Sequence, residues 1–321
     1  MISPEEPPAE LLEAIEASHH ECERILEQFT GELTQSGTPN RLYHYTDGPG
    51  LWGILESGVF RLTDIFGLND PTELRHGIDH AGRVFAVEAR RGHPAAKLFA
   101  QKFRHGLREG MTQLAQMFVA CFSRDGDELG QWRAYADNGR GFALEFDGHQ
   151  LEQVFLNAAP ATSTHSTFPV LYDPVQLRDL SRQLSRRVIP LTAMPQGRRM
   201  SNAAINEFMK QLSIYAGFHV VHSALYFKHK AYEQEQEYRF LQMHAAGADV
   251  PDLRHRARGS VFVRYTPFRW TSQHASPLKG IVIGPAADAR RARAFVRECL
   301  KHAGWDISGI RIRRSRIPYR G

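Results

Sequence analysis

The stretch Arg41–Thr46, with the sequence RLYHYT, constrains the fold of this chain more than any other segment. Its residues favour a strand, in which alternation would put His44 and Thr46 on one face and the two tyrosines on the other. Asp47-Gly48-Pro49 then ends the strand, and the apolar residues that follow recur at helical spacing until Gly58. The order strand, turn, short helix predicts the floor of a ligand site.

The composition is that of a globular protein without membrane spans. The chain has 321 residues, of which 42% are apolar and 23% charged. No apolar run is long enough to cross a bilayer, and the N-terminus lacks the pattern of a secretory signal. Cys22, Cys121 and Cys299 are far apart and match no metal-ligand spacing. We therefore expect a cytoplasmic protein with free thiols, no membrane partner and no metal site.

The charge is distributed unevenly. Residues 1–35 carry nine glutamates and one arginine, about −8, so the remainder of the chain carries about +13 against a total of +5. A basic body favours an anionic partner such as nucleic acid or a phosphorylated ligand, although a solvated surface explains it equally well. No basic cluster in the sequence is interleaved with aromatic residues in the manner of a base-stacking platform.

An acidic amphipathic helix is predicted over residues 9–33. It could pack on the body, mediate a homodimer or cover a basic site. We expect the division to be an N-terminal acidic helix in residues 1–38 and a single α+β domain in residues 39–321, with a helical insertion at 174–228.

Strands and helices alternate irregularly along the rest of the chain, which favours the α+β class. Strands are predicted at 41–46, 118–123, 141–146, 235–241, 260–265, 280–284 and 310–317. Helices are predicted at 51–58, 76–111 with a break near 92–94, 127–136, 176–188, 201–226 and 287–303. Loops are predicted at 157–169, 189–200 and 243–256.

Three stretches carry polar or aromatic groups on or beside predicted strands. They are His44 with Thr46, Ser123 with Trp132 and Tyr135, and Glu235 with Glu237. Each also has a structural explanation. A strand histidine is commonly hydrogen-bonded, aromatic residues one helical turn apart are commonly core residues, and the two acids could be paired with Arg239.

A family resemblance connects these stretches. LYHYT followed by LWGILESG resembles the opening motif of ADP-ribosyltransferase-like folds, where a strand His-x-Thr precedes a helix that ends in a glycine. More closely, residues 41 to 320 resemble a bacterial domain-of-unknown-function family grouped with that fold. The motifs that carry this closer resemblance are Tyr43-His44-Tyr45, Asn69-Asp70-Pro71-Thr72-Glu73, Cys121-Phe122-Ser123, Trp132-Arg133-Ala134-Tyr135-Ala136, Gly141, Lys228, Glu235-Gln236-Glu237-Tyr238-Arg239 and Ile281-Val282-Ile283-Gly284.

The resemblance implies an ADP-ribosyltransferase-like split mixed or antiparallel sheet with flanking helices, and NAD as co-substrate. His44 would hold the nicotinamide-side ribose, and the backbone of Tyr45 would meet the nicotinamide amide. Tyr135 would stack on the nicotinamide, Glu237 would orient the ribose, and Glu235 would assist the acceptor. The remaining residues of the implied cofactor site are Thr46, Ser123 and Trp132, with Arg61, Arg75 or Arg133 on the pyrophosphate.

Such residues suit the chemistry that the resemblance implies. Cleavage of the ribose–nicotinamide bond passes through an oxocarbenium-like cation, which a nearby carboxylate stabilises. We expect an NAD-dependent ADP-ribosyltransferase or NAD glycohydrolase of the His-Tyr-Glu branch, because the serine-threonine-serine motif of the arginine-directed branch is missing. The acceptor, protein or nucleic acid, stays open. The alternatives are an RNA 2′-phosphotransferase-like enzyme and a non-catalytic nucleic-acid-binding module. A toxin or defence role rests on fold-level analogy alone.

Overall fold

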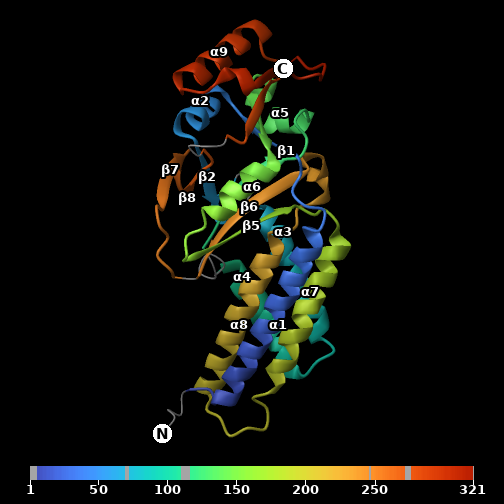
Figure 1. Cartoon of the computed structure of the whole chain (residues 1–321). Helices are drawn as coiled ribbons and strands as arrows, with labels where there is room; N and C mark the ends of the chain where they lie inside the picture. Colours follow the sequence, from blue (N-terminus) through green and yellow to red (C-terminus); the bar gives the residue numbers. More distant parts are fainter. Residues whose placement is uncertain (1–5, 69–71, 110–115, 246, 272–275, 321) are drawn as a thin grey trace. The chain divides into compact units, whose positions relative to one another are not determined.

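The computed structural model describes residues 6–68, 72–109, 116–245, 247–271 and 276–320 (Figure 1). The chain divides into two compact units. The helical unit contains Met1–Gln35, Asn69–Gln116 and Leu171–Lys230, and the β unit contains the rest. The fold is mixed α+β, as the sequence predicts. The first helix belongs to the helical unit, together with residues 69–116 and 171–230. The sequence-based division instead separates this helix from one domain that spans residues 39–321.

The helical unit consists of long helices that pack along one another. They are α1 (Ala9–Leu33), α3 (Thr72–Ala89), α4 (Pro94–Glu109), α7 (Pro174–Val188) and α8 (Asn202–Ala224), with the short η4 (Ile189–Ala193). Ser201 begins α8 as an N-cap, because its hydroxyl accepts a hydrogen bond of 3.1 Å from the N–H of Ala204. A Cβ atom at Gly77 would lie 2.7 Å from that of Ala224, so this glycine lets α3 approach α8 closely.

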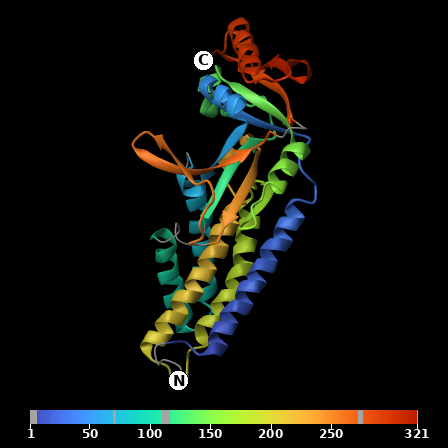
Figure 2. The ribbon, with the colours of Figure 1, turned by 60° about the vertical axis from the view of Figure 1, so that its left-hand side comes forward.

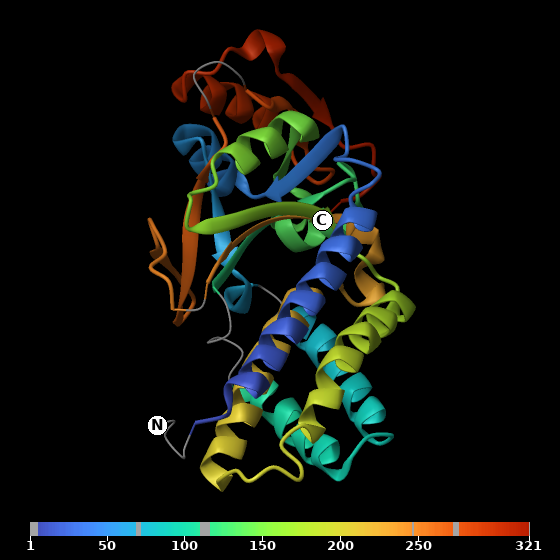
Figure 3. The same ribbon diagram turned by 60° about the horizontal axis from the view of Figure 1, so that its bottom comes forward.

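The apolar stripe of α1 is buried inside this chain. Leu11, Ile15, Cys22 and Leu26 are each at most 3% exposed, and α1 packs against α7 and α8 (Figures 1 and 3). Of the three roles that the sequence leaves open for this helix, packing on the body is therefore the one observed. A homodimer through α1 stays a prediction, and it would have to use the polar side of the helix.

The β unit is built on one mixed sheet. Its strands within the described residues are β1 (Arg41–Thr46), β2 (Val59–Asp64), β3 (Gln116–Ser123), β4 (Phe142–Asp147), β5 (Ser163–Pro169), β6 (Glu237–His244), β7 (Arg254–Arg258), β8 (Val261–Arg269), β9 (Leu278–Ile283) and β10 (Arg311–Arg314). The main order is β10-β9-β4-β1-β3-β2-β8-β7, and β6 pairs with β3 and β5. The β10–β9 pair is parallel, whereas β1–β4, β2–β8 and β7–β8 are antiparallel. Figure 2 shows the β7–β8 hairpin in orange.

The two faces of the sheet differ in character. The core face carries Leu42, Leu144 and Ile281, which belong to the main apolar cluster. It is covered by α2 (Gly48–Ser57), α6 (Gly148–Asn157) and α9 (Ala289–His302). The opposite face, here called the tyrosine face, carries Tyr43 and Tyr45. Part of it packs on α5 (Leu129–Tyr135).

Several segments differ from the sequence-based expectation. The sequence predicts loops at residues 157–169 and 243–256, but these segments contain β5 and β7. The strand expected from Glu235 begins at Glu237 instead. Glu235 ends the short helix η5 (Lys230–Glu235), and Gln236 has a φ of 44°, which breaks the extended backbone. Residues 69–71 of the Asn69–Glu73 motif lie outside the described residues. No described helix is long and apolar enough to cross a membrane.

Candidate functional site

The three stretches predicted to share a site do meet through their backbones. Tyr43 of β1 pairs with Ser123 at the end of β3. The Ser123 hydroxyl donates a hydrogen bond of 2.7 Å to the carbonyl oxygen of Glu235. The N–H of Arg124 donates one of 3.0 Å to the carbonyl of Gln236. The structure therefore brings β1, the end of β3 and the start of β6 side by side.

The side chains of His44 and Glu237, however, point to opposite faces of the sheet. His44 lies on the core face, with its ring centroid 4.9 Å from that of Phe60 and 5.7 Å from that of Phe122. Phe240 of β6 packs on the same Phe122, at 4.8 Å. Because side chains alternate along a strand, Glu237 points away from that face. The two residues do not form one site in this conformation.

His44 has a structural hydrogen bond. Its Nδ1 donates to the carbonyl oxygen of Cys121 over 3.2 Å. Burial lowers the pKa of the ring, which favours the neutral form. Thr46, also on the core face, is half-buried beside the start of α2. This environment matches the alternative that the sequence leaves open, a hydrogen-bonded strand histidine.

The two predicted acids occupy different environments. Glu237 is 5% exposed, and its Oε1 accepts a hydrogen bond of 2.6 Å from the Nε of Arg239, which is 2% exposed. Glu235 is half-buried in η5. The expectation that both acids share one face of a strand is wrong, because only Glu237 lies on the strand.

Of the three aromatic residues in the predicted cofactor site, Tyr45, Trp132 and Tyr135, the first two are core residues. The hydroxyl of Tyr45 donates to the carbonyl of Asp125 over 2.9 Å and accepts from the N–H of Glu128 over 3.0 Å. Trp132 is fully buried against the Tyr45 ring, and its indole N–H donates to Asp127 over 2.9 Å. A fully buried indole cannot contact a cofactor without rearrangement. Tyr135, at 37% exposed, is accessible.

The arginines proposed for the pyrophosphate belong to different units. Arg75 is exposed on α3 of the helical unit, and Arg133 is exposed on α5 of the β unit. Arg61 is exposed on β2, on the tyrosine face, with its guanidinium carbon 5.3 Å from the ring centroid of Tyr265.

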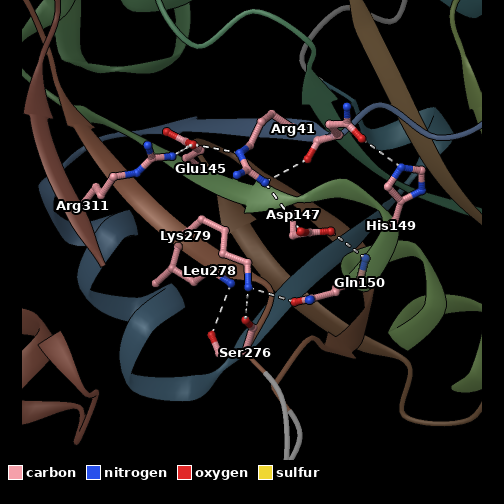
Figure 4. A network of polar contacts seen from close by, with 10 residues as sticks. Arg41, Glu145, Asp147, His149, Gln150, Ser276, Leu278, Lys279 and Arg311 are labelled. Carbon is pink, nitrogen blue, oxygen red and sulfur yellow. Dashed lines mark hydrogen bonds and ion pairs between the residues drawn. The ribbon is translucent and has the colours of Figure 1, made fainter. Parts of the chain in front are cut away.

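A cluster that the sequence does not predict surrounds Glu145 on the tyrosine face (Figure 4). Glu145 is 4% exposed, and its Oε1 lies 3.1 Å from the Nε of Arg41 and 3.0 Å from an Nη of Arg311. Its Oε2 lies 3.6 Å from the Nε of Arg313, and Arg41 also reaches Asp147 at 3.5 Å. We call these five residues the Glu145 cluster. Three guanidinium groups share two carboxylates, so most of the positive charge is neutralised.

Tyr43 lies beside the Glu145 cluster. A Cβ atom at Gly126 would lie 2.3 Å from the Tyr43 ring, so only a glycine lets the Asp125–Asp127 turn rest on this tyrosine. Burial raises the pKa of the Tyr43 hydroxyl, the Glu145 carboxylate raises it further, and Arg313 opposes both effects.

A second arginine group lies on the same face of the sheet, across β2, β8 and β7. Cross-strand pairing places Tyr265 opposite both Thr63 and Arg254, and Arg61 lies two residues before Thr63. Strand alternation then adds two more arginines of β7 to this face. We call it the β7–β8 arginine face, composed of Arg61, Arg254, Arg256, Arg258 and Tyr265.

Arg256 is the residue that sets this face apart. Its Nε is buried and has no hydrogen-bond partner in the described structure. Burial lowers the pKa of its guanidinium, and the charges of Arg61 and Arg258 lower it further. Arg254 reaches Asp252 at 3.8 Å, and Arg258 donates to the carbonyl of Leu68 over 3.2 Å.

Sequence reasoning misses this face for an identifiable reason. It names Arg61 but treats residues 243–256 as a loop, and it finds no basic cluster interleaved with aromatic residues. The aromatic and basic residues interleave across three strands rather than along one. The alternation RHRAR at 254–258 is the signal that could have revealed it.

Comparison with known proteins adds one match. A family described as "Protein of unknown function (DUF2971)" matches residues 131–240. The match spans about a third of the chain, from α5 to the middle of β6, and includes Trp132, Tyr135 and Glu237. It agrees with the resemblance to a family of unknown function, whereas a relationship to ADP-ribosyltransferases stays a prediction. No curated protein and no solved structure matches the chain significantly.

Proposed function

We propose that this protein binds single-stranded nucleic acid through the β7–β8 arginine face. The observation that carries the proposal is the environment of Arg256, where positive charges gather around a buried donor without a partner. A buried donor left unsatisfied costs about 1–3 kcal/mol. A phosphate oxygen would satisfy this donor and relieve the repulsion among the arginines at the same time.

The geometry of the face suits a repeating anion. Arg254, Arg256 and Arg258 alternate along β7, and alternate residues on a strand are about 6.7 Å apart. This row offers regularly spaced charge to a phosphate backbone, and phosphate contacts supply most of the affinity for nucleic acid. Tyr265, with Arg61 against its ring, adds an aromatic surface on which an unpaired base can stack.

The test is fluorescence anisotropy with labelled single-stranded RNA and DNA over a range of salt concentrations. We expect saturable binding that weakens steeply with salt. The double variant Arg61→Ala/Arg256→Ala should bind at least about tenfold more weakly. The slope of log affinity against log salt should become shallower by about one for each arginine–phosphate pair that the variant removes.

The matched control is Arg290→Ala/Arg291→Ala, which removes the same charge from two exposed positions at the start of α9. It should leave affinity nearly unchanged. Equal losses in the two double variants would mean that net charge, rather than the β7–β8 arginine face, carries binding. Wild-type protein that is folded but binds neither RNA nor DNA at low salt would refute the proposal.

NAD-dependent ADP-ribosyl transfer, on an ADP-ribosyltransferase-like fold, is a second proposal. The observation in its favour is the hydrogen bond between Ser123 and Glu235, which joins two of the implied stretches beside β1. The opposite orientation of His44 and Glu237 weighs against it, because the two would have to act on one ribose.

Calorimetric titration with NAD tests this second proposal without requiring the acceptor. Saturable binding that is weakened in Tyr135→Ala and Glu237→Gln would support it. Phe262→Ala, which removes an exposed ring from the β8 hairpin, is the control and should not change the affinity. Absence of binding at millimolar NAD in folded protein would exclude the proposal.

A further inference from the structure

A groove runs between the two antiparallel helices α3 and α4 of the helical unit. It has a volume of about 620 Å³. Its lining consists of Ala86 on α3, Arg90 directly after the end of α3, and Lys97, Ala100, Gln101, Arg104 and His105 on α4. Small-molecule sites usually occupy about 300–1,000 Å³, so the groove is large enough for a ligand of nucleotide size. Ala86 is half-buried and offers a small apolar surface, and the charged residues come from α4 and from the turn that follows α3.

The stem of the Arg104 side chain packs against Gly82 of α3 in this groove. A Cβ atom at Gly82 of α3 would lie 3.2 Å from the Cγ of Arg104, so the glycine leaves room for the arginine stem against the helix. The Nε of Arg104 is buried and has no hydrogen-bond partner in the described structure. Among the described side chains, Arg104 and Arg256 are the two arginines with this property. An unsatisfied buried donor costs free energy, which a bound acceptor would recover.

The charges around the groove are all of one sign. Arg90, Lys97 and Arg104 line it, and none of the described lining residues is a carboxylate. Glu88, the nearby acid of α3, reaches Arg182 of α7 at 3.3 Å instead. Cations gathered on the two walls of a groove attract an anion, and arginine donors match phosphate oxygens well.

We infer that the α3–α4 groove binds a small molecule that carries two or more phosphate groups, of about the size of a nucleoside diphosphate. The phosphates would contact Arg90, Lys97 and Arg104, and the Nε of Arg104 would gain an acceptor. The remainder of the ligand would lie over Ala86. This site belongs to the helical unit and does not depend on the β7–β8 arginine face.

The test is calorimetric titration of the full chain with ADP and with pyrophosphate at low salt. We expect saturable binding, with affinity reduced at least tenfold in Arg104→Met. That substitution keeps an unbranched apolar stem against Gly82 and removes the guanidinium. Lys97→Met should weaken binding several-fold. Gly82→Ala, which changes no charge, should also weaken it because the new Cβ displaces the Arg104 stem.

Lys102→Met is the matched control, because Lys102 is exposed on α4 but does not line the groove. It should bind as the wild type does. Equal affinity for ADP and pyrophosphate would support recognition of the phosphates alone, and tighter binding of ADP would support a contact of the nucleoside with Ala86.

Three results would overturn the inference. The first is no saturable binding of either ligand by folded wild-type protein. The second is unchanged affinity in Arg104→Met. The third is a loss of affinity for single-stranded oligonucleotide in the groove variants, without measurable ADP or pyrophosphate binding, which would assign the groove to a polymer. Circular dichroism and thermal melting of each variant separate loss of binding from loss of folding.

Discussion

The tyrosine face of the β unit carries two groups of arginines, and they differ in what neutralises them. In the Glu145 cluster, Arg41, Arg311 and Arg313 share a buried carboxylate, and Arg41 also reaches Asp147. On the β7–β8 arginine face, Arg256 has a buried Nε without a partner, and the nearby charges that act on it are other arginines. The number of arginines is similar, but the Glu145 cluster is built on a buried carboxylate, whereas Asp252, which Arg254 reaches, is exposed.

This difference separates a structural role from a binding role. Buried charges are normally paired, because an unpaired one costs more free energy than the fold can recover locally. The Glu145 cluster follows this rule and joins β1, β4 and β10. The β7–β8 arginine face departs from it, and departures from local rules are concentrated at functional sites. The comparison therefore predicts opposite consequences for substitutions in the two groups.

The largest effect should follow Glu145→Gln. Three guanidinium groups would lose their shared carboxylate. Because these arginines stay partly exposed to water, we expect the free energy of unfolding to fall by about 2 kcal/mol, the value of a hydrogen bond to a charged group. Denaturant unfolding measures this change. Glu10→Gln is the control, because Glu10 accepts two hydrogen bonds from Arg198 on the surface, and it should change stability little. Similar losses in both variants would mean that the burial of Glu145 adds nothing to the stability of its cluster.

An intermediate effect on stability should distinguish Arg41 from Arg256. Arg41→Met removes donors from Glu145 and should lower the free energy of unfolding by about 1 kcal/mol. Arg256→Met removes an unpartnered donor and should leave it unchanged or raise it slightly, while nucleic-acid affinity falls. Thermal melting and anisotropy on the same samples test both statements. If Arg256→Met destabilises as much as Arg41→Met, the β7–β8 arginine face is structural.

The smallest effect concerns pH and the Glu145 cluster. Burial, followed by the Glu145 carboxylate, raises the pKa of Tyr43 above its usual value near 10. The unfolded chain therefore loses this proton first as the pH rises, so the stability that Tyr43 contributes is present below pH 10 and lost above it. Melting curves between pH 8 and 11 should show a shallower decline in Tyr43→Phe than in the wild type. An identical decline would mean that the folded state does not perturb this hydroxyl.

The sequence predicts the elements whose signals are local. The helix at 9–33, the strand at 41–46 and the long helix after Ser201 have clear periodicity or caps, and the structure contains all three. β5 has the sequence STHSTFP, with no apolar alternation, and it exists because it pairs with β6 along its length. β7 likewise pairs with β8. Strands of this kind are determined by their neighbours, which a single sequence does not reveal.

For the candidate site too, the sequence predicts some contacts and misses those made by distant residues. Pattern and resemblance place Ser123 and Glu235 together, and the Ser123 hydroxyl does bond to the Glu235 carbonyl. The same reasoning cannot assign a strand residue to a face of a folded sheet, which is why His44 and Glu237 diverge. The contacts around Glu145 join residues more than 100 positions apart, as do those between Arg61 and Tyr265. No local pattern connects such residues.

The strands at the two ends of the main sheet order are both basic, β10 with the sequence RIRR and β7 with RHRAR. End strands offer their outer backbone groups to strands of other molecules, which is a route to aggregation. Two copies that approached edge to edge would bring rows of like charge together, and this repulsion is strongest at low salt, where screening is weak. The arginines therefore oppose self-association as well as attracting anions, and a bound polyanion would neutralise the row on β7 that keeps copies of the protein apart.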